Sequence, residues 1–203
     1  MKVHNQEKNI LTGTLILTFA ALLIKILSAF YRIPFQNIVG DIGFYIYQQV
    51  YPFYGIAVAL STYGFPIVIS KLYTEEMAKE EQRNEKQLLL VSAVFLSAFG
   101  FLCFALLYGG AGWLANYMKD PELTILFRMV SVVFLIMPVL SLLRGYFQGT
   151  GDMVPTAVSQ VGEQFIRVAT ILISSVILVH NHFSLYRVGS GAIFGSVTGG
   201  IIS

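Results

Sequence analysis

The stretch Ile10–Tyr31 reads ILTGTLILTFAALLIKILSAFY, and its one charged residue is Lys25. A run of about 20 apolar residues is long enough to cross the hydrocarbon core of a bilayer as a helix. Backbone N–H and C=O groups find no water inside a bilayer, so a continuous apolar run must pair them within itself by forming a helix. The stretch therefore predicts a membrane-spanning helix and an all-α fold.

Further stretches share this character, and together they predict six spans. They are Gly43–Ser70, Leu88–Tyr108, Leu123–Leu143, Ala157–Val179 and Gly189–Ser203. Of the 203 residues, 56% are hydrophobic and 12% are charged, whereas about a quarter of the residues of a soluble domain are charged. The composition predicts an all-α polytopic membrane protein in a lipid bilayer, and no basic run indicates a nucleic-acid partner.

The last stretch differs from the others. Its glycines Gly191, Gly195 and Gly199 recur every four residues, a pattern typical of closely packed membrane helices. The sequence stops about 15 residues into this span, which is short of the roughly 20 that a crossing requires. We therefore expect a truncated sixth helix and a chain that is the N-terminal part of a longer protein or the product of a truncated open reading frame.

Lysine and arginine residues between the stretches are unevenly distributed. If the N-terminus is cytoplasmic, the outward cations are Arg32, Lys119 and Arg187, and the inward cations are Lys2, Lys8, Lys71, Lys79, Arg83, Lys86 and Arg144. Cytoplasmic loops of membrane proteins carry an excess of positive residues. The distribution therefore predicts a cytoplasmic N-terminus.

The second stretch contains four residues that favour helix bending: Pro52, Gly55, Gly64 and Pro66. Proline removes a backbone donor and collides with the preceding turn, so a kink is expected near it. Interrupted helices often line cavities in transporters. The alternative is that membrane helices tolerate these residues without a functional reason.

Two of the predicted helices carry a polar stripe. The first consists of Thr14, Thr18, Ala21, Lys25, Ser28 and Arg32. The second consists of Thr156, Gln160, Glu163, Arg167, Thr170 and Ser174. Residues at steps of three and four share one helix face, and charges are costly against lipid. Both stripes are therefore predicted to face neighbouring helices or a wet cavity.

The charges within the membrane are mostly positive. The cations are Lys25, Arg128 and Arg167, with Arg32 at the outer mouth, and the single acid is Glu163. A cavity lined in this way attracts anions such as phosphates. These four cations are therefore candidate substrate-binding residues.

Glu163 precedes Arg167 by four residues, the favourable order for an ion pair along a helix. With Gln160 one turn earlier, Glu163 is a candidate charge-pair or gating residue that would orient Arg167. The alternative is that the pair only neutralises itself and fixes helix packing. Arg128 also has an alternative role, because it lies near the outer end of its stretch and can reach the headgroups.

Nothing in the sequence indicates an enzyme, a cofactor or a metal centre. His180 and His182 lack the further ligands that a metal site requires. The glycine pairs around Thr150 and Ser190 lack the strand–turn–helix context of a dinucleotide site. No pair of carboxylates or nucleophile with a base is evident.

Two stretches carry a family resemblance. Lys25–Lys71 reads KILSAFYRIPFQNIVGDIGFYIYQQVYPFYGIAVALSTYGFPIVISK, and Leu143–Val168 reads LRGYFQGTGDMVPTAVSQVGEQFIRV. Both resemble the polysaccharide-exporter and lipid-flippase branch of the MATE-like (MOP) superfamily. Within that branch the chain is similar to the stage V sporulation protein B and YtgP group, which is related to the lipid II flippase MurJ.

The resemblance implies two six-helix lobes around a central cavity, of which this chain would be the first, without the C-terminal lobe. It implies a bacterial plasma-membrane protein that flips a lipid-linked oligosaccharide by alternating access. In the MurJ branch, cations of the first helix line the cavity for the substrate pyrophosphate, and Lys25 and Arg32 occupy the comparable stretch. That branch commonly has an arginine on the second helix, whereas Gly43–Ser70 contains no cation.

Other functions stay open at this point. A multidrug or organic-cation antiporter would depend on Glu163 and on an ion gradient. A non-transporting membrane scaffold would tolerate neutralisation of all the stripe charges. A fragment without its second lobe would be inert.

Overall fold

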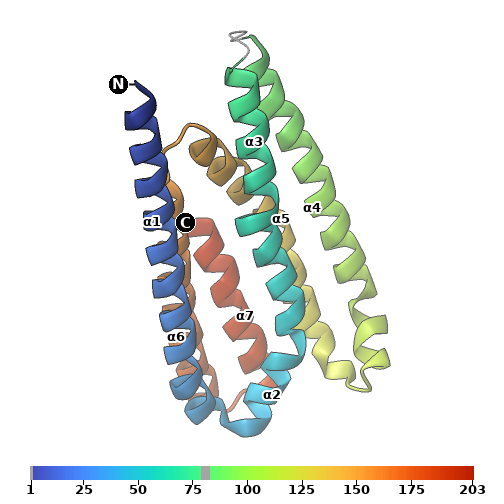
Figure 1. Cartoon of the computed structure of the whole chain (residues 1–203). Coiled ribbons are helices and arrows are strands. Elements are labelled where there is room, and N and C mark those ends of the chain that lie inside the picture. The colour runs from blue at the N-terminus through green and yellow to red at the C-terminus, as the bar shows by residue number, and fades with distance from the viewer. Residues whose placement is uncertain (1, 79–82) are drawn as a thin grey trace.

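The computed structural model describes the backbone of residues 2–78 and 83–203 and the side chains of residues 12–78 and 85–203. All six predicted stretches are helical, and the described residues contain no strand. The fold class is confirmed as an all-α polytopic membrane protein (Figure 1). Four cations assigned to the cytoplasmic side lie outside the described side chains: Lys2, Lys8, Lys79 and Arg83.

The helices follow one another with short connections. Their bounds are α1 (Lys2–Phe30), α2 (Arg32–Ala59), the π-helical turn η1 (Leu60–Gly64), α3 (Phe65–Met77), α4 (Arg83–Tyr117), the 3₁₀ turn η2 (Pro121–Leu123), α5 (Thr124–Gly149), α6 (Val154–His180) and α7 (Leu185–Ile202).

Four segments of the described chain are long and apolar enough to cross a membrane: Thr12–Met77, Glu85–Tyr117, Pro121–Gly149 and Val154–His180. The first contains two of the predicted spans, because α1 and α2–α3 run in opposite directions (Figure 1). The helix α7 is not among the four. It is 18 residues long and rich in glycine and serine.

The reversal between α1 and α3 depends on Gly40. This residue has φ 72° and ψ 176° inside α2, a backbone conformation that is essentially restricted to glycine. The short piece of α2 before Gly40 turns across one end of the bundle, and the remainder climbs toward α3 (Figure 1). The predicted second span began only at Gly43, so this break was not expected.

A second irregularity lies at η1, where the Phe65 N–H donates to the Leu60 carbonyl. Pro66 has no N–H to offer the preceding turn, which favours this wider turn. The irregular backbone thus coincides with Gly64 and Pro66. Pro52 and Gly55 lie within α2, whose non-helical dihedral angles are confined to Gly40.

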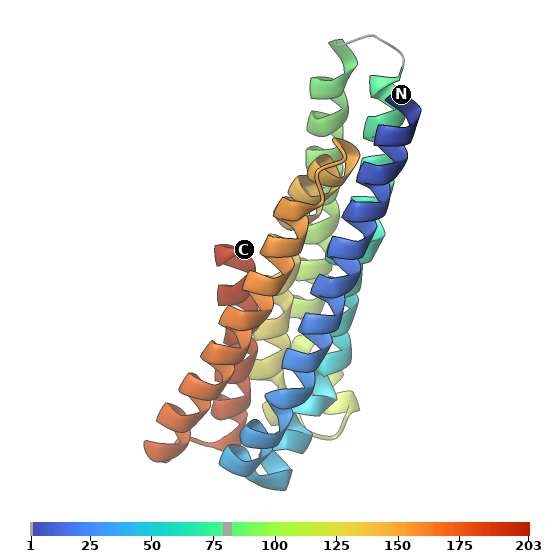
Figure 2. The same ribbon diagram turned by 60° about the vertical axis from the view of Figure 1, so that its left-hand side comes forward.

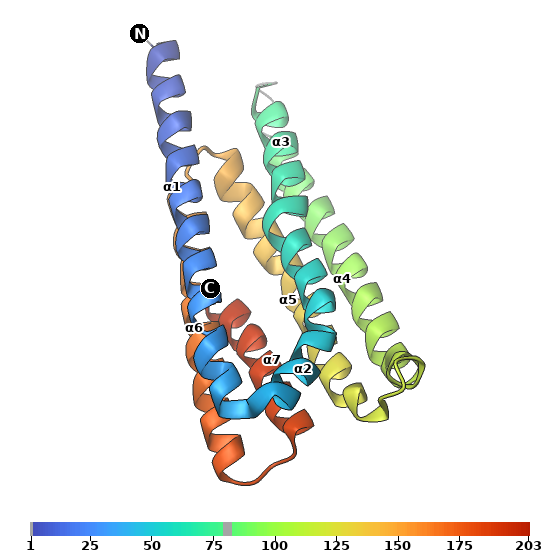
Figure 3. The ribbon, with the colours of Figure 1, turned by 60° about the horizontal axis from the view of Figure 1, so that its bottom comes forward.

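The bundle has two groups of helices with α7 between them. Figures 2 and 3 show α1 beside α6, and α3, α4 and α5 on the other side. The glycines of α7 pack on α6 as predicted. A Cβ atom added to Gly199 would lie 2.7 Å from the Glu163 carbonyl oxygen, and one added to Gly195 would lie 2.9 Å from that of Arg167. This close approach fixes the position of α6.

Candidate functional site

A cavity of about 190 Å³ lies between α1, the α2–η1 segment and α6, and we call it the central pocket. Its polar lining residues are Ser28, Thr62, Gln160, Glu163, Gln164 and Arg167. Three tyrosines also line it: Tyr51, Tyr54 and Tyr63. Polar groups inside a membrane bundle converge on one space here, which is a common location for ligand sites between helices.

The helix α6 contributes most of the polar lining. Its predicted stripe points into the bundle, where Thr156 and Arg167 are buried and Gln160 and Glu163 are partly buried. The opposite face is apolar and exposed, with Val158 and Phe165 as examples. The amphipathic spacing of the sequence therefore predicted correctly which face of α6 points into the bundle.

Arg167 is a buried cation in the middle of α6, and its side chain is 4% exposed. Its Nη1 donates to the Tyr54 hydroxyl at 2.7 Å. Its guanidinium lies 5.1 Å from the ring centroid of Tyr54 and 5.8 Å from that of Tyr31. The Nε atom is buried and has no hydrogen-bond partner among the described residues. Arg167 has no ion pair there either, because Glu163 pairs with another arginine, so its positive charge is unpaired beside the pocket.

The ion pair expected between Glu163 and Arg167 is not formed. Glu163 instead accepts a 2.6 Å hydrogen bond from Nη2 of Arg144 on α5, whose side chain is 2% exposed. Helical spacing allows a contact between positions four apart, but it cannot exclude a better-placed partner on a neighbouring helix. Glu163 therefore neutralises Arg144 and leaves Arg167 to the tyrosines.

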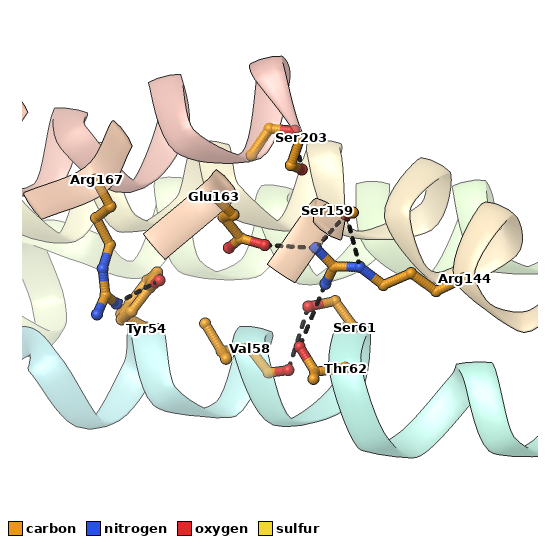
Figure 4. A network of polar contacts seen from close by, with 10 residues as sticks. Tyr54, Val58, Ser61, Thr62, Arg144, Ser159, Glu163, Arg167 and Ser203 are labelled. Carbon is orange, nitrogen blue, oxygen red and sulfur yellow. Dashed lines mark hydrogen bonds and ion pairs between the residues drawn. The ribbon is translucent and has the colours of Figure 1, made fainter. Parts of the chain in front are cut away.

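Arg144 joins three elements of the bundle, as Figure 4 shows. Besides the bond to Glu163, its Nη2 and Nε donate to the Ser159 hydroxyl at 3.0 and 3.3 Å. Its Nη1 donates to the Thr62 hydroxyl of η1 at 3.3 Å. The guanidinium thus holds α5, α6 and the π turn together, which places Glu163 and Thr62 at the wall of the central pocket.

Lys25 is exposed and does not line the central pocket, but its neighbours on α1 do. Ile24 and Ser28 line the pocket, and Gln164 donates to the Ser28 hydroxyl at 2.9 Å. By helical periodicity Lys25 shares the face of Ser28. Other α1 residues, Phe19, Leu23 and Ile26, lie on the far side and line a separate apolar groove beside α6.

The remaining two predicted cations have different positions. Arg32 is exposed, and its guanidinium lies 5.8 Å from the ring centroid of Tyr51, which lines the central pocket. Arg128 is exposed over Tyr108 of α4, at 5.2 Å. Neither Arg128 nor Tyr108 lines the central pocket.

The comparisons with known proteins agree with these observations. Residues 10–203 match the family described as polysaccharide biosynthesis protein. The chain belongs to this polysaccharide biosynthesis protein family. The resemblance to the lipid and polysaccharide flippases, drawn from the sequence, is thereby confirmed.

Three relatives of this family come from Bacillus subtilis (strain 168). The uncharacterized membrane protein YabM is 50% identical over 191 residues, which are 94% of this chain and 35% of YabM. The lipid II flippase MurJ is 32% identical over 182 residues, with 85% of this chain and 34% of MurJ covered. Stage V sporulation protein B is 29% identical over 199 residues, with 97% and 38% covered.

The chain therefore spans about a third of the length of these family relatives. No solved structure gives a significant match. The described residues contain no group of three or more His, Cys, Asp or Glu side chains that could hold a metal ion.

Three site residues of this family member were not expected from the sequence: Arg144, Tyr54 and Gln164. Arg144 was placed outside the membrane because the predicted span ended at Leu143, whereas α5 continues to Gly149. The aromatic residues Tyr146 and Phe147 beyond Arg144 were the available signal, since aromatics mark the true membrane boundary. Tyr54 follows Tyr47 and Tyr51 at helical spacing, and Gln164 lies four residues after Gln160 and three before Arg167, so the spacing alone could have indicated both.

Proposed function

We propose that this chain is the N-terminal lobe of a transporter that flips a lipid-linked oligosaccharide across the bacterial plasma membrane by alternating access. The proposed substrate is an undecaprenyl-pyrophosphate-linked peptidoglycan precursor or polysaccharide unit. Family membership and the relatives named as lipid II flippase and stage V sporulation protein support this class of function. Because the relatives are about three times as long, a second lobe would complete the cavity.

The observation that carries this proposal is Arg167. A buried guanidinium that is held by aromatic rings and has no carboxylate partner in the described residues supports the proposal of an anion site inside the helix bundle. Phosphate oxygens accept hydrogen bonds and match the planar donors of arginine. An unpaired charge in a membrane helix is costly, and such residues commonly mark the path of a substrate or an ion.

Lys25 and Arg32 would extend this site toward the outer mouth, since both lie beside residues that line the central pocket. Arg128 contacts Tyr108 away from the pocket, so we leave it out of the proposed binding set. Glu163 would act as a gate through Arg144 and not through Arg167, and Gln160, which has no hydrogen bond to either arginine, is left out of the gate.

The test is transbilayer movement of a fluorescent undecaprenyl-pyrophosphate-linked sugar in proteoliposomes that contain the protein in the form in which the cell makes it. Replacing Arg167 by Gln removes charge-assisted hydrogen bonds, and we expect the flipping rate to fall about tenfold or more. Lys25→Gln should also reduce the rate. Arg187→Gln is the matched control, because Arg187 is an exposed arginine stacked on Phe183. Unchanged flipping in both Arg167→Gln and Lys25→Gln would remove the site assignment.

Two other functions predict different results in this assay. An organic-cation antiporter would take up a fluorescent cation along a proton or sodium gradient, and Glu163→Gln would abolish that uptake. The pairing of Glu163 with Arg144 argues against this reading, because the carboxylate is already neutralised. A membrane scaffold would move neither lipid nor cation and would tolerate both Arg167→Gln and Lys25→Gln.

A further inference from the structure

The central pocket contains more than an anion site needs. Gln160 lines it and makes no hydrogen bond with any residue that the structure describes. Gln164 uses its amide nitrogen for Ser28, and its carbonyl oxygen remains an acceptor at the pocket. One carboxylate oxygen of Glu163 accepts a hydrogen bond from Arg144. Carbonyl and carboxylate oxygens accept hydrogen bonds, as phosphate oxygens do, so these oxygens suit a part of a ligand that donates, whereas the Gln160 amide can both donate and accept.

Aromatic faces form another part of the pocket wall. Tyr51 and Tyr54 lie about one turn apart on α2, with ring centroids 5.8 Å apart and planes tilted by 50°. The face of an aromatic ring is electronegative and therefore attracts the weakly positive C–H groups of a sugar ring. Tyr51 is only partly buried, so its ring is accessible at the pocket.

The part of the cavity that this chain forms has room for a small group. Its volume of about 190 Å³ has room for a group the size of one sugar ring. The ring would lie within reach of Arg167, which is 2.7 Å from the Tyr54 hydroxyl. Donors, acceptors and an aromatic face next to an unpaired cation match a polyhydroxylated ring that carries a phosphate.

We propose that the central pocket is a sugar subsite, which takes the first sugar ring of the glycan while Arg167 holds the adjacent phosphate. Tyr51 supplies the platform for the ring, and Gln160 and Gln164 supply hydrogen bonds to its hydroxyl or amide groups. This inference rests on the proposed function and deepens it, because the glycan itself, besides the pyrophosphate, would be recognised in this lobe.

The test compares binding of two lipids to the protein in nanodiscs, in the form in which the cell makes it. One lipid is undecaprenyl pyrophosphate, and the other is the same lipid carrying one N-acetylhexosamine. Gln160→Ala should weaken binding of the sugar-bearing lipid about three- to tenfold, the effect of one or two hydrogen bonds, and leave the bare lipid unchanged. Arg167→Gln should weaken binding of both lipids.

A second pair of variants tests the platform. Tyr51→Leu should weaken only the sugar-bearing lipid, and Tyr51→Phe, which keeps the ring, should restore its affinity. Arg187→Gln is again the control. Because Gln160 is not part of the apolar core, Gln160→Ala decides the matter if Tyr51→Leu does not fold.

The outcomes separate the two proposals. If Gln160→Ala leaves both affinities unchanged or lowers both equally, the sugar subsite is overturned while the proposed function stands. If the wild-type protein binds neither lipid more tightly than uncharged undecaprenol, the proposed function itself fails.

Discussion

Two buried arginines, Arg144 and Arg167, have opposite surroundings in this bundle. Arg144 is saturated by a carboxylate and two hydroxyls, whereas Arg167 has one hydroxyl, two aromatic rings and an unpaired Nε. Burying a charge is tolerated only where partners compensate for lost solvation. Arg144 therefore has the character of a structural residue, and Arg167 has that of a residue with unused binding capacity.

The Arg144–Glu163 pair is expected to behave as a unit. Glu163→Gln leaves the Arg144 charge buried and uncompensated, and we expect a loss of about 3–5 kcal/mol of unfolding free energy. The double variant Arg144→Met with Glu163→Leu removes both charges and should recover most of that loss. Thermal unfolding in detergent measures all three proteins. Equal instability of the single and double variants would show that the pair does not act together.

The residue-level predictions succeeded where periodicity was sufficient. Spacing alone oriented Gln160, Glu163 and Arg167 toward the centre, because a charged face cannot lie against lipid. Spacing could not choose the partner of Glu163, since that choice depends on where Arg144 of another helix lies. Spacing also predicted that Lys25 and Arg32 face a neighbouring helix or a cavity, whereas both are exposed and lie beside the pocket.

At the scale of elements, α7 contacts the backbone of α6 directly through glycine. Gly199→Ala would bring a methyl group to 2.7 Å from the Glu163 carbonyl oxygen. Backbone cannot move aside as a flexible side chain does, so we expect a loss of about 1–3 kcal/mol and reduced flipping. Gly112→Ala in α4 is the control, because nothing lies within 4 Å of the added atom. Its unfolding temperature, read by thermal denaturation, should equal or slightly exceed that of the wild type.

The break in α2 leads to a separate prediction, for which Gly112→Ala is again the control. Gly40 also has open space around an added Cβ, but its φ of 72° is unfavourable for any other residue. Gly40→Ala should therefore cost about 1–3 kcal/mol through the backbone alone. If Gly40→Ala and Gly112→Ala unfold at the same temperature, the helix does not need this break.

The helices themselves were predictable because long apolar runs have few alternatives in a membrane. The reversal between the first two spans was also predicted, but the helical form of that connection and its break at Gly40 were not, because the residues around Gly40 have the polar character of an ordinary loop between spans. The π turn was indicated by Gly64 and Pro66, whereas Pro52, which looks equivalent in the sequence, lies in regular helix.

For the whole molecule, the orientation in the membrane can be tested directly. The connection between α4 and α5 and that between α5 and α6 lie at opposite ends of the bundle (Figure 1). With Cys103 replaced by Ala, a cysteine at exposed Glu122 should react with an impermeant maleimide on intact cells. A cysteine at exposed Thr150 should react only after permeabilisation, because we propose a cytoplasmic N-terminus. The reverse labelling pattern would show that the N-terminus is not cytoplasmic.

The glycine face of α7 has one more consequence. Gly195 and Gly199 abut the peptide groups of Arg167 and Glu163, and the side chains of these two residues line the central pocket. A side chain added at either glycine would therefore shift the segment of α6 that carries both charges, although neither glycine lines the pocket.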